Sequence, residues 1–326
     1  MLARLGSIFW NRDERRVRSF WRVLSLLALM TGLGVGFRAA GIYPEPGTPA
    51  YYLVIALSRL VVAVSVVWLV GRFLDRRPLR DFGLGLSRPW LADLAFGLVL
   101  GAALMTGIFL VQWRLGWLSV TGSWRTTAAD MPFGQAILVP LVIFVCVGIV
   151  EELIARGYLL RNLAEGLAFR WLGGPRGGLI AAIVISSALF ALGHLGNPNT
   201  TWVSTVNIGL AGALLALGYV LTGQLALPIG LHITWNLFQA SVFGFPVSGV
   251  TRMRTTVLAT AETGPDLWTG GVFGPEAGLL GVVTMLVGIG LMLAWVRWRR
   301  GEVSVVAGLA EPPARRGSRA VAPAAG

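Results

Sequence analysis

Glu151 and Glu152 are adjacent acidic residues at the end of an apolar stretch, and Arg156 follows four residues after Glu152. Residues four apart share one face of a helix, so Glu152 and Arg156 can form an ion pair, whereas Glu151 is rotated by about 100° towards a different neighbour. We therefore expect Arg156 to neutralise Glu152 and to leave Glu151 for acid–base chemistry. The same residues are also compatible with a charge cluster that ends a transmembrane helix, with Arg156 reaching the lipid head groups.

His194 and His232, the two histidines of the chain, both lie in apolar segments. Phe190 precedes His194 by about one helical turn and Asn236 follows His232 by one turn, so each histidine has a companion on its own helix face. A lone histidine in a helix is more often a packing residue than a catalytic one. Two such pairs in a chain that also carries an intramembrane Glu-Glu pair favour a functional site.

The composition indicates which elements must position these residues. Of the 326 residues 55% are hydrophobic and 13% are charged, and the mean hydropathy is +0.72, whereas ordinary soluble domains are about 25% charged. This deficit of charge excludes a disordered protein, a coiled coil and most soluble enzymes. Apolar stretches of about 20 residues, the length that crosses a bilayer, predict an all-α, polytopic bundle of about eight transmembrane helices. Their expected ranges are Phe20–Gly41, Tyr51–Leu74, Trp90–Leu110, Phe133–Leu153, Gly178–Leu195, Val203–Leu221, Leu225–Phe243 and Gly278–Trp298.

The arginines predict the orientation of this bundle. All 27 basic residues are arginines, against 15 acidic residues, for a net charge of +12. They gather in the N-terminal segment, the second and fourth loops and the tail, so the positive-inside rule predicts that both termini are cytoplasmic. Arg252 and Arg254 in the seventh loop run against this pattern. The basic segments lack interleaved aromatic residues and a Gly-rich phosphate loop, so we expect no binding of nucleic acid.

Three short patterns occur in order on separate predicted helices: Glu-Glu-x-x-x-Arg at 151–156, Phe-x-x-x-His at 190–194 and His-x-x-x-Asn at 232–236. Each alone is weak, but the ordered set resembles the CPBP (ABI) family of intramembrane proteases, the CAAX prenyl endopeptidase and bacteriocin-processing group. The resemblance covers about residues 133–249. It implies an endopeptidase in a prokaryotic plasma membrane whose partners are membrane lipid and a membrane-associated or lipidated peptide or protein. The implied site residues are Glu151, Glu152, Arg156, His194, His232 and Asn236.

The predicted organisation of the chain follows from these boundaries. Residues 1–132 are expected to form three N-terminal helices, 133–249 a helical catalytic core, 250–300 an outer loop with the last helix, and 301–326 a disordered cytoplasmic tail. One conflict of depth arises, because His194 lies about 24 Å along its helix from the cytoplasmic side. A helix that ended at Leu153 would leave Glu151 too far away. We therefore expect the fourth helix to continue past Arg156, to about Leu163.

Hydrolysis of a peptide bond needs an activated water and a stabilised oxyanion. We expect Glu151 to activate the water, His194 to orient it, and His232 and Asn236 to stabilise the oxyanion, with Glu152, Arg156 and Phe190 supporting the site. Alternatively, Glu151, His194 and His232 could bind zinc and leave an open position for water. We favour the metal-free mechanism, because no helix carries a His-Glu-x-x-His pattern and because Glu152, the base that a zinc site would require, is spaced to pair with Arg156. A bound cofactor therefore stays unassigned, with zinc as the alternative.

Two other classes of protein stay open at this point. The helices could form a non-catalytic, immunity-type module that captures a peptide partner in the same polar cavity. They could also form a proton-coupled transporter that uses Glu151 and the histidines as a relay, although the sequence has no convincing internal repeat. Peptide cleavage by the purified protein separates the first from an enzyme, and flux into sealed vesicles separates the second.

Overall fold

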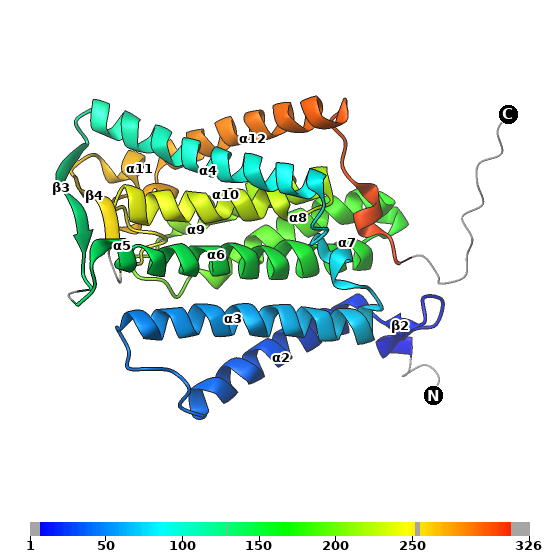
Figure 1. Cartoon of the computed structure of the whole chain (residues 1–326). Coiled ribbons are helices and arrows are strands. Elements are labelled where there is room, and N and C mark those ends of the chain that lie inside the picture. The colour runs from blue at the N-terminus through cyan, green and yellow to red at the C-terminus, as the bar shows by residue number, and fades with distance from the viewer. Residues whose placement is uncertain (1–6, 129, 252–254, 314–326) are drawn as a thin grey trace.

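A computed structural model describes residues 7–128, 130–251 and 255–313. In this part of the chain, seven helical segments are long and apolar enough to cross a membrane, and they lie side by side in one bundle (Figure 1). They are α2 (Ser19–Ala39), α3 (Pro49–Val70, continued by η1, Gly71–Asp75), α4 (Arg88–Arg114), the segment Phe133–Gly166, α8 (Gly174–Gly193), α9 (Trp202–Thr222) and α12 (Leu279–Arg300). The remaining predicted span, Leu225–Phe243, corresponds to the shorter α10 (Ala226–Leu237) and its π-helical extension η5 (Phe238–Val242). The prediction of a helical bundle with about eight spans is confirmed.

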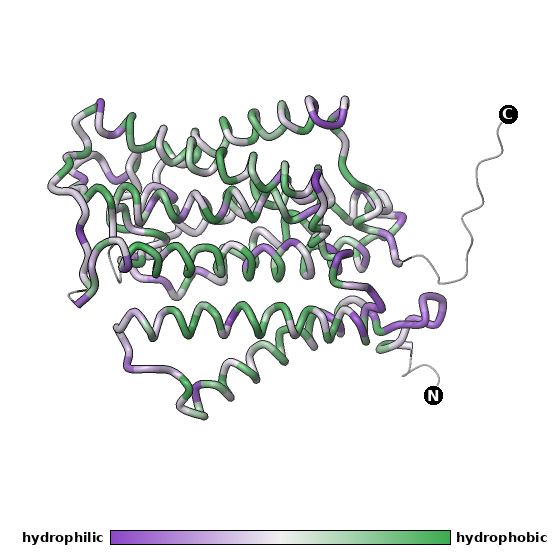
Figure 2. The backbone as a smooth tube through the Cα atoms, in the orientation of Figure 1, coloured by the Kyte–Doolittle hydropathy of each residue, from purple (hydrophilic) through white to green (hydrophobic). Residues whose placement is uncertain are grey.

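The surface of the bundle is that of a membrane protein. Figure 2 shows hydrophobic residues along the middle of the helices and hydrophilic residues gathered towards the two ends of the bundle. Large apolar side chains on the outer helix faces are exposed, among them Leu57, Val99, Val184 and Leu286. Such faces are stable only against lipid tails. The chain is an integral, multi-pass membrane protein.

The segment Phe133–Gly166 is a single long helix with a change of pitch. It consists of α5 (Phe133–Ala136), α6 (Leu138–Glu152), the π-helical η3 (Leu153–Leu160) and α7 (Arg161–Gly166). Its 34 residues extend over about 51 Å, more than the roughly 30 Å of a bilayer core. The predicted continuation past Arg156 is confirmed, and Glu151 lies near the middle of the helix rather than at its end.

Helix α10 lies in the interior of the bundle, packed against α4, α6 and α9. Its approach to α4 is so close that a Cβ atom at Gly97 would lie 2.3 Å from the carbonyl oxygen of Leu227, and one at Gly101 would lie 2.4 Å from that of Leu231. The small-residue pair of α4 therefore allows backbone contact, as such pairs do in membranes. Because α10 is held on several sides, the side chains that it carries have fixed positions.

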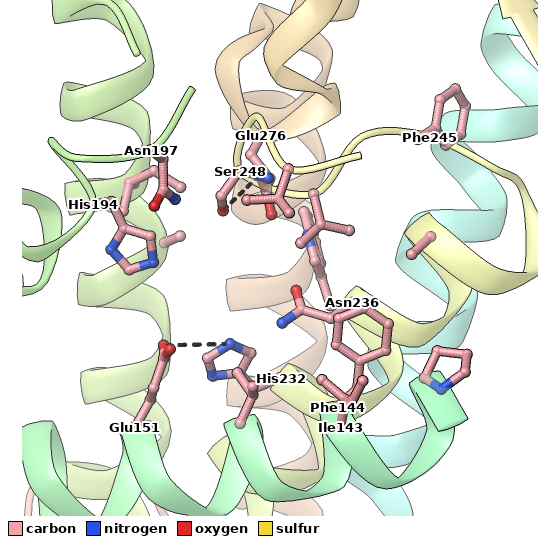
Figure 3. Close-up of a pocket in the computed structure, with 18 of the residues that line it drawn as sticks. Ile143, Phe144, Glu151, His194, Asn197, His232, Asn236, Phe245, Ser248 and Glu276 are labelled. Carbon is pink, nitrogen blue, oxygen red and sulfur yellow. Dashed lines mark hydrogen bonds and ion pairs between the residues drawn. The ribbon is translucent and has the colours of Figure 1, made fainter. Parts of the chain in front are cut away.

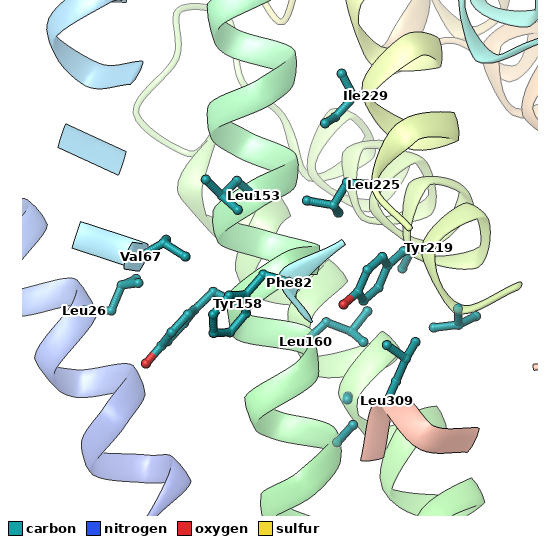
Figure 4. Packing of buried hydrophobic residues seen from close by; sticks show 14 of the residues in the cluster. Leu26, Val67, Phe82, Leu153, Tyr158, Leu160, Tyr219, Leu225, Ile229 and Leu309 are labelled. Carbon is teal, nitrogen blue, oxygen red and sulfur yellow. The ribbon is translucent and has the colours of Figure 1, made fainter. Parts of the chain in front are cut away.

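At one end of the bundle, where both described chain ends lie, aromatic and charged side chains connect α2 and α3 to the long segment Phe133–Gly166. The rings of Phe82 and Tyr158 lie 5.3 Å apart within a buried apolar cluster (Figure 4). Asp75 accepts hydrogen bonds of 2.7 Å from Arg22 and from the hydroxyl of Tyr158. Glu165 forms ion pairs with four arginines, Arg16, Arg22, Arg77 and Arg161. Several arginines of the basic segments thus form ion pairs inside the protein, in addition to indicating its orientation in the membrane.

Two small antiparallel sheets accompany the helices and were not expected from the sequence. Strands β1 (Trp10–Asn11) and β2 (Arg16–Val17) pair near the N-terminus. At the opposite end of the bundle, β3 (Leu118–Thr126) pairs with β4 (Thr255–Glu262), with Thr126 opposite Thr255. Both strands of the second sheet contain more than one Thr, a residue that favours extended backbone. Short helices α11 (Asp266–Thr269), η6 (Gly271–Phe273) and η7 (Pro275–Ala277) lead from β4 to α12.

Two short helices, η2 (Leu79–Phe82) and η4 (Arg170–Leu172), lie in loops at one end of the bundle.

The first part of the C-terminal tail differs from the predicted disorder, because it contains a third short helix, η8 (Ala307–Ala310), at the same end. In η8, Leu309 and Ala310 are buried, and the next residue, Glu311, accepts a hydrogen bond from Arg77 through its carbonyl oxygen. The apolar side chains of η8 therefore pack beside α7 and α8. The rest of the predicted tail, 314–326, and Arg252 and Arg254 lie outside the described residues.

Candidate active site

A cavity of about 360 Å³ opens among α3, α6, α8 and α10 and extends to η7. Most of its wall is apolar, and its polar groups converge from different helices (Figure 3). The structure brings together in this cavity the four residues predicted to act in catalysis, which are Glu151, His194, His232 and Asn236. Phe190 also lines it, whereas Glu152 and Arg156 lie behind the wall.

The two adjacent glutamates have different surroundings. Glu152 Oε1 accepts one hydrogen bond of 2.8 Å from Arg156 Nη1 and another of 2.8 Å from His232 Nδ1. The side chain of Glu152 is 0% exposed, whereas that of Glu151 is 34% exposed. The expected ion pair of Glu152 with Arg156 is present, and it also holds His232. Glu151 is the carboxylate that opens to the cavity.

His232 connects these two carboxylates. Because Nδ1 faces the carboxylate of Glu152, it carries a proton and donates it to that hydrogen bond. The other ring nitrogen, Nε2, lies 3.9 Å from Glu151 Oε2, the contact drawn as a dashed line in Figure 3. This separation is longer than a direct hydrogen bond, so both atoms stay available to a substrate or a water molecule.

The ring of Phe190 lies at the meeting point of the three sequence patterns. The guanidinium carbon of Arg156 lies 4.3 Å from the ring centroid, a distance at which the cation is attracted to the aromatic face. The rings of His194 and His232 lie 4.7 Å and 6.3 Å from that of Phe190. His194 Nδ1 is 2.8 Å from the carbonyl oxygen of Phe190, so Nδ1 donates and Nε2 is left for the cavity. Phe190 thus lies beside Arg156 and both histidines.

Asn236 completes the polar side of the cavity. It lies one turn after His232 on α10, and Figure 3 shows its amide beside the ring of His232. Its side chain is buried, at 7% exposed, and among the described residues it makes no hydrogen bond. A buried amide without an internal partner is available to donate to a ligand.

The donor atoms do not match the predicted zinc set. A catalytic zinc ion needs three protein ligands at about 2.0–2.2 Å from one point. Within the part of the chain that the structure describes, no three side chains of His, Cys, Asp or Glu come together in this way. The arrangement of Glu151, His194 and His232 therefore does not fit zinc.

The sequence reasoning missed two charged residues of the cavity, Arg59 and Glu276. Glu276 lies in η7, where its Oε2 accepts hydrogen bonds from the backbone N–H (2.6 Å) and the hydroxyl (3.0 Å) of Ser248. Burial raises the pKa of the Glu276 carboxyl, while Ser248 and the nearby His194 act in the opposite direction. Arg59 gave a signal, a charge in the middle of an apolar segment. Glu276 gave little, because it lies just before the last predicted helix.

Fold and site together define a helical integral membrane protein with a buried acid–base cavity, the class to which intramembrane hydrolases belong. Residues 133–238, about a third of the chain, match the family model described as Type II CAAX prenyl endopeptidase Rce1-like. The chain therefore carries a domain of the Rce1-like CAAX prenyl endopeptidase (CPBP) family, a family of proteases, as the sequence patterns predicted. The match covers every predicted site residue and leaves Arg59 and Glu276 outside. No curated protein and no solved structure matches the chain.

Proposed function

We propose that the protein is an intramembrane endopeptidase that hydrolyses a peptide bond with Glu151 as the general base. The single observation that carries this proposal is the approach of Glu151 Oε2 to His232 Nε2, at 3.9 Å, on the wall of a cavity that also contains His194 and Asn236. A carboxylate that is open to the cavity can accept a proton from water, while the donors beside it stabilise developing negative charge.

The reaction follows from these positions. Glu151 accepts a proton from a water molecule oriented by Nε2 of His194, and the resulting hydroxide attacks the carbonyl carbon of the substrate. The oxyanion accepts hydrogen bonds from the Asn236 amide and from Nε2–H of His232. When the C–N bond breaks, Glu151 returns its proton to the leaving amine, so that the base is regenerated.

The charges of the site support this assignment of protons. With Nδ1–H bonded to Glu152, His232 can donate from Nε2 only when its ring carries both protons. The imidazolium and Arg156 then balance the two carboxylates, Glu151 and Glu152. A charge-balanced cluster is the arrangement that a low-dielectric interior tolerates.

The substrate follows from the family and from the setting. CAAX sequences are C-terminal tetrapeptides that begin with a prenylated cysteine, and a prenyl chain is compatible with the mainly apolar wall of the cavity. The substrate class is therefore a membrane-associated, prenylated C-terminal peptide. The arginine-rich end of the bundle, with both described chain ends, faces the cytoplasm.

The test uses the full chain in nanodiscs and a farnesylated decapeptide that ends in Cys-Val-Ile-Ser. We expect mass spectrometry to detect cleavage after the farnesylated cysteine. Glu151→Gln should lower kcat by about 10²–10⁴-fold or more, because the general base is lost. Glu45→Gln, which changes an exposed glutamate of the first loop, is the matched control and should retain full activity.

Two results would overturn the proposal. Full activity of Glu151→Gln would remove Glu151 from the reaction. Tight binding of the peptide by the unmodified protein without any cleavage would identify a capture module instead of an enzyme.

A further inference from the structure

Arg59 is a cation in the middle of a membrane-spanning helix. It lies 10 residues after the start and 11 before the end of α3 (Pro49–Val70), which places its Cα atom about 15 Å from either end. The hydrocarbon core of a bilayer is about 30 Å thick. Arg59 therefore lies close to the midplane, where a charged side chain is unfavourable and usually serves a function.

The side chain of Arg59 has no internal partner that would explain its position. Among the described residues, no carboxylate lies within ion-pair distance of it and no group forms a hydrogen bond with it. It is exposed rather than buried in the packing of α2, α3 and α6. A structural role in the folded chain therefore does not account for this charge.

Arg59 lines the same cavity as Glu151 and His232. Tyr52, two turns earlier on the same face of α3, lines it as well, and the facing wall on α6 is apolar, with Ile143, Phe144 and Val147. A guanidinium in such a wall is suited to bind a planar anion through two parallel hydrogen bonds. Because lipid phosphates lie at the membrane surfaces, beyond the apolar core, the anion that reaches this depth is one carried by the substrate.

We propose that Arg59 binds the C-terminal carboxylate of the peptide substrate. This inference rests on the proposed function, since it assigns a further residue to the same cavity. A peptide cleaved near its C-terminus presents a neutral backbone and one terminal carboxylate to the site. Arg59 selects that carboxylate and thereby sets the position of the scissile bond relative to Glu151. It is a specificity residue supplied by α3, outside the family domain.

The test measures binding without turnover, so that it is independent of cleavage. The full chain carrying Glu151→Gln is placed in phosphatidylcholine nanodiscs, and fluorescence anisotropy measures its Kd for the labelled farnesylated decapeptide ending in Cys-Val-Ile-Ser. The peptide is used as the free acid and as the C-terminal amide. We expect the acid to bind roughly tenfold or more tightly, as a charge-assisted hydrogen bond predicts.

Variants at Arg59 then test whether this residue causes the preference for the free acid over the amide. Adding Arg59→Gln should reduce the ratio of the two Kd values to about one, and adding Arg59→Lys should retain part of it because the charge is kept. The matched control is Arg38→Gln, an exposed arginine in the last turn of α2, which should keep the full preference. Size-exclusion profiles equal to that of the parent protein verify folding.

Three outcomes would overturn the inference: equal binding of acid and amide, binding of neither, or a preference that survives Arg59→Gln. Loss of the preference in nanodiscs that contain phosphatidylglycerol would also overturn it, because the arginine would then bind lipid phosphate. Cleavage by the unmodified protein without a preference for the acid leaves the proposed function standing and removes this inference alone. A preference for the acid that depends on Arg59, in a protein that does not cleave the peptide, would remove the proposed function and leave Arg59 as a carboxylate-binding residue.

Discussion

Glu152 and His232 lie 80 positions apart in the chain and share a hydrogen bond of 2.8 Å between Oε1 and Nδ1. The same oxygen also accepts from Arg156, so that one buried carboxylate fixes both a cation and the orientation of an imidazole ring. Because Nδ1 is held, the ring turns Nε2 towards Glu151. The pair therefore links the structural glutamate to the one that faces the cavity.

This link predicts different effects for the two adjacent glutamates. Glu152→Gln leaves Arg156 buried without its counter-charge and should lower the free energy of unfolding by about 3–5 kcal/mol, as the breaking of other buried ion pairs does. Glu151→Gln should leave stability nearly unchanged, because that side chain is partly exposed and bonds to no neighbour within hydrogen-bonding distance. Thermal unfolding can be followed with a thiol-reactive dye. The single cysteine, Cys146, is only 3% exposed, so the dye reacts with it when the protein unfolds.

The comparison of these two variants also provides the control, since both remove one carboxylate charge from neighbouring positions. Equal melting temperatures would show that Glu152 does not hold the site together. A loss of stability in Glu151→Gln alone would make Glu151 the structural glutamate and Glu152 the one that is free for chemistry.

The arrangement of donors makes a further prediction about metal. Since the described residues do not gather three ligands at one point, activity of the purified protein should persist after washing with a chelator. Elemental analysis of the same active sample should find far less than one zinc per chain. About one zinc per chain, with activity lost on its removal and restored on its addition, would contradict the metal-free reaction.

The helical bundle and four polar residues of the cavity, Glu151, His194, His232 and Asn236, were predictable from local features of the sequence. Apolar length predicts the spans, and a separation of four residues predicts the pairs Glu152–Arg156 and His232–Asn236. The predicted difference in membrane depth between Glu151 and His194 was resolved correctly by a longer fourth helix. When that helix continues past Arg156, Glu151 lies near its middle and can reach the depth of His194 on the neighbouring helix.

Contacts between distant segments were not predictable in the same way. The bond from Glu152 to His232 and the position of Phe190 among Arg156 and both histidines depend on how α6, α8 and α10 pack. The buried Glu276 depends on a loop, residues 246–251, whose path has no periodic pattern. The strands β3 and β4 pair across more than a hundred residues, and two short segments with a few Thr residues give only a weak signal for such pairing.

The orientation of the protein can be tested with cysteines at opposite ends of the bundle. Thr121 on β3 and Ser304 before η8 are both exposed, and Cys146 is buried and gives little background. We expect a membrane-impermeant maleimide added outside intact cells to label Thr121→Cys and to spare Ser304→Cys, because the arginine-rich end faces the cytoplasm. Labelling both variants after permeabilisation is the control. The reverse pattern would invert the topology.

Glu276 predicts a dependence of stability on pH. Burial raises the pKa of its carboxyl above the ordinary value of 4.5, and this effect exceeds that of the hydrogen bonds from Ser248 and the charge of His194. Between the ordinary and the raised pKa, the folded protein binds a proton that the unfolded chain has lost, so stability falls as the pH rises through this window. Glu276→Gln keeps an acceptor for Ser248 and cannot ionise. Its melting temperature should therefore fall less than that of the unmodified protein between about pH 5 and about pH 8. Glu45→Gln, at an exposed glutamate, should follow the unmodified protein, and identical pH slopes for all three proteins would show that Glu276 stays ionised in the fold.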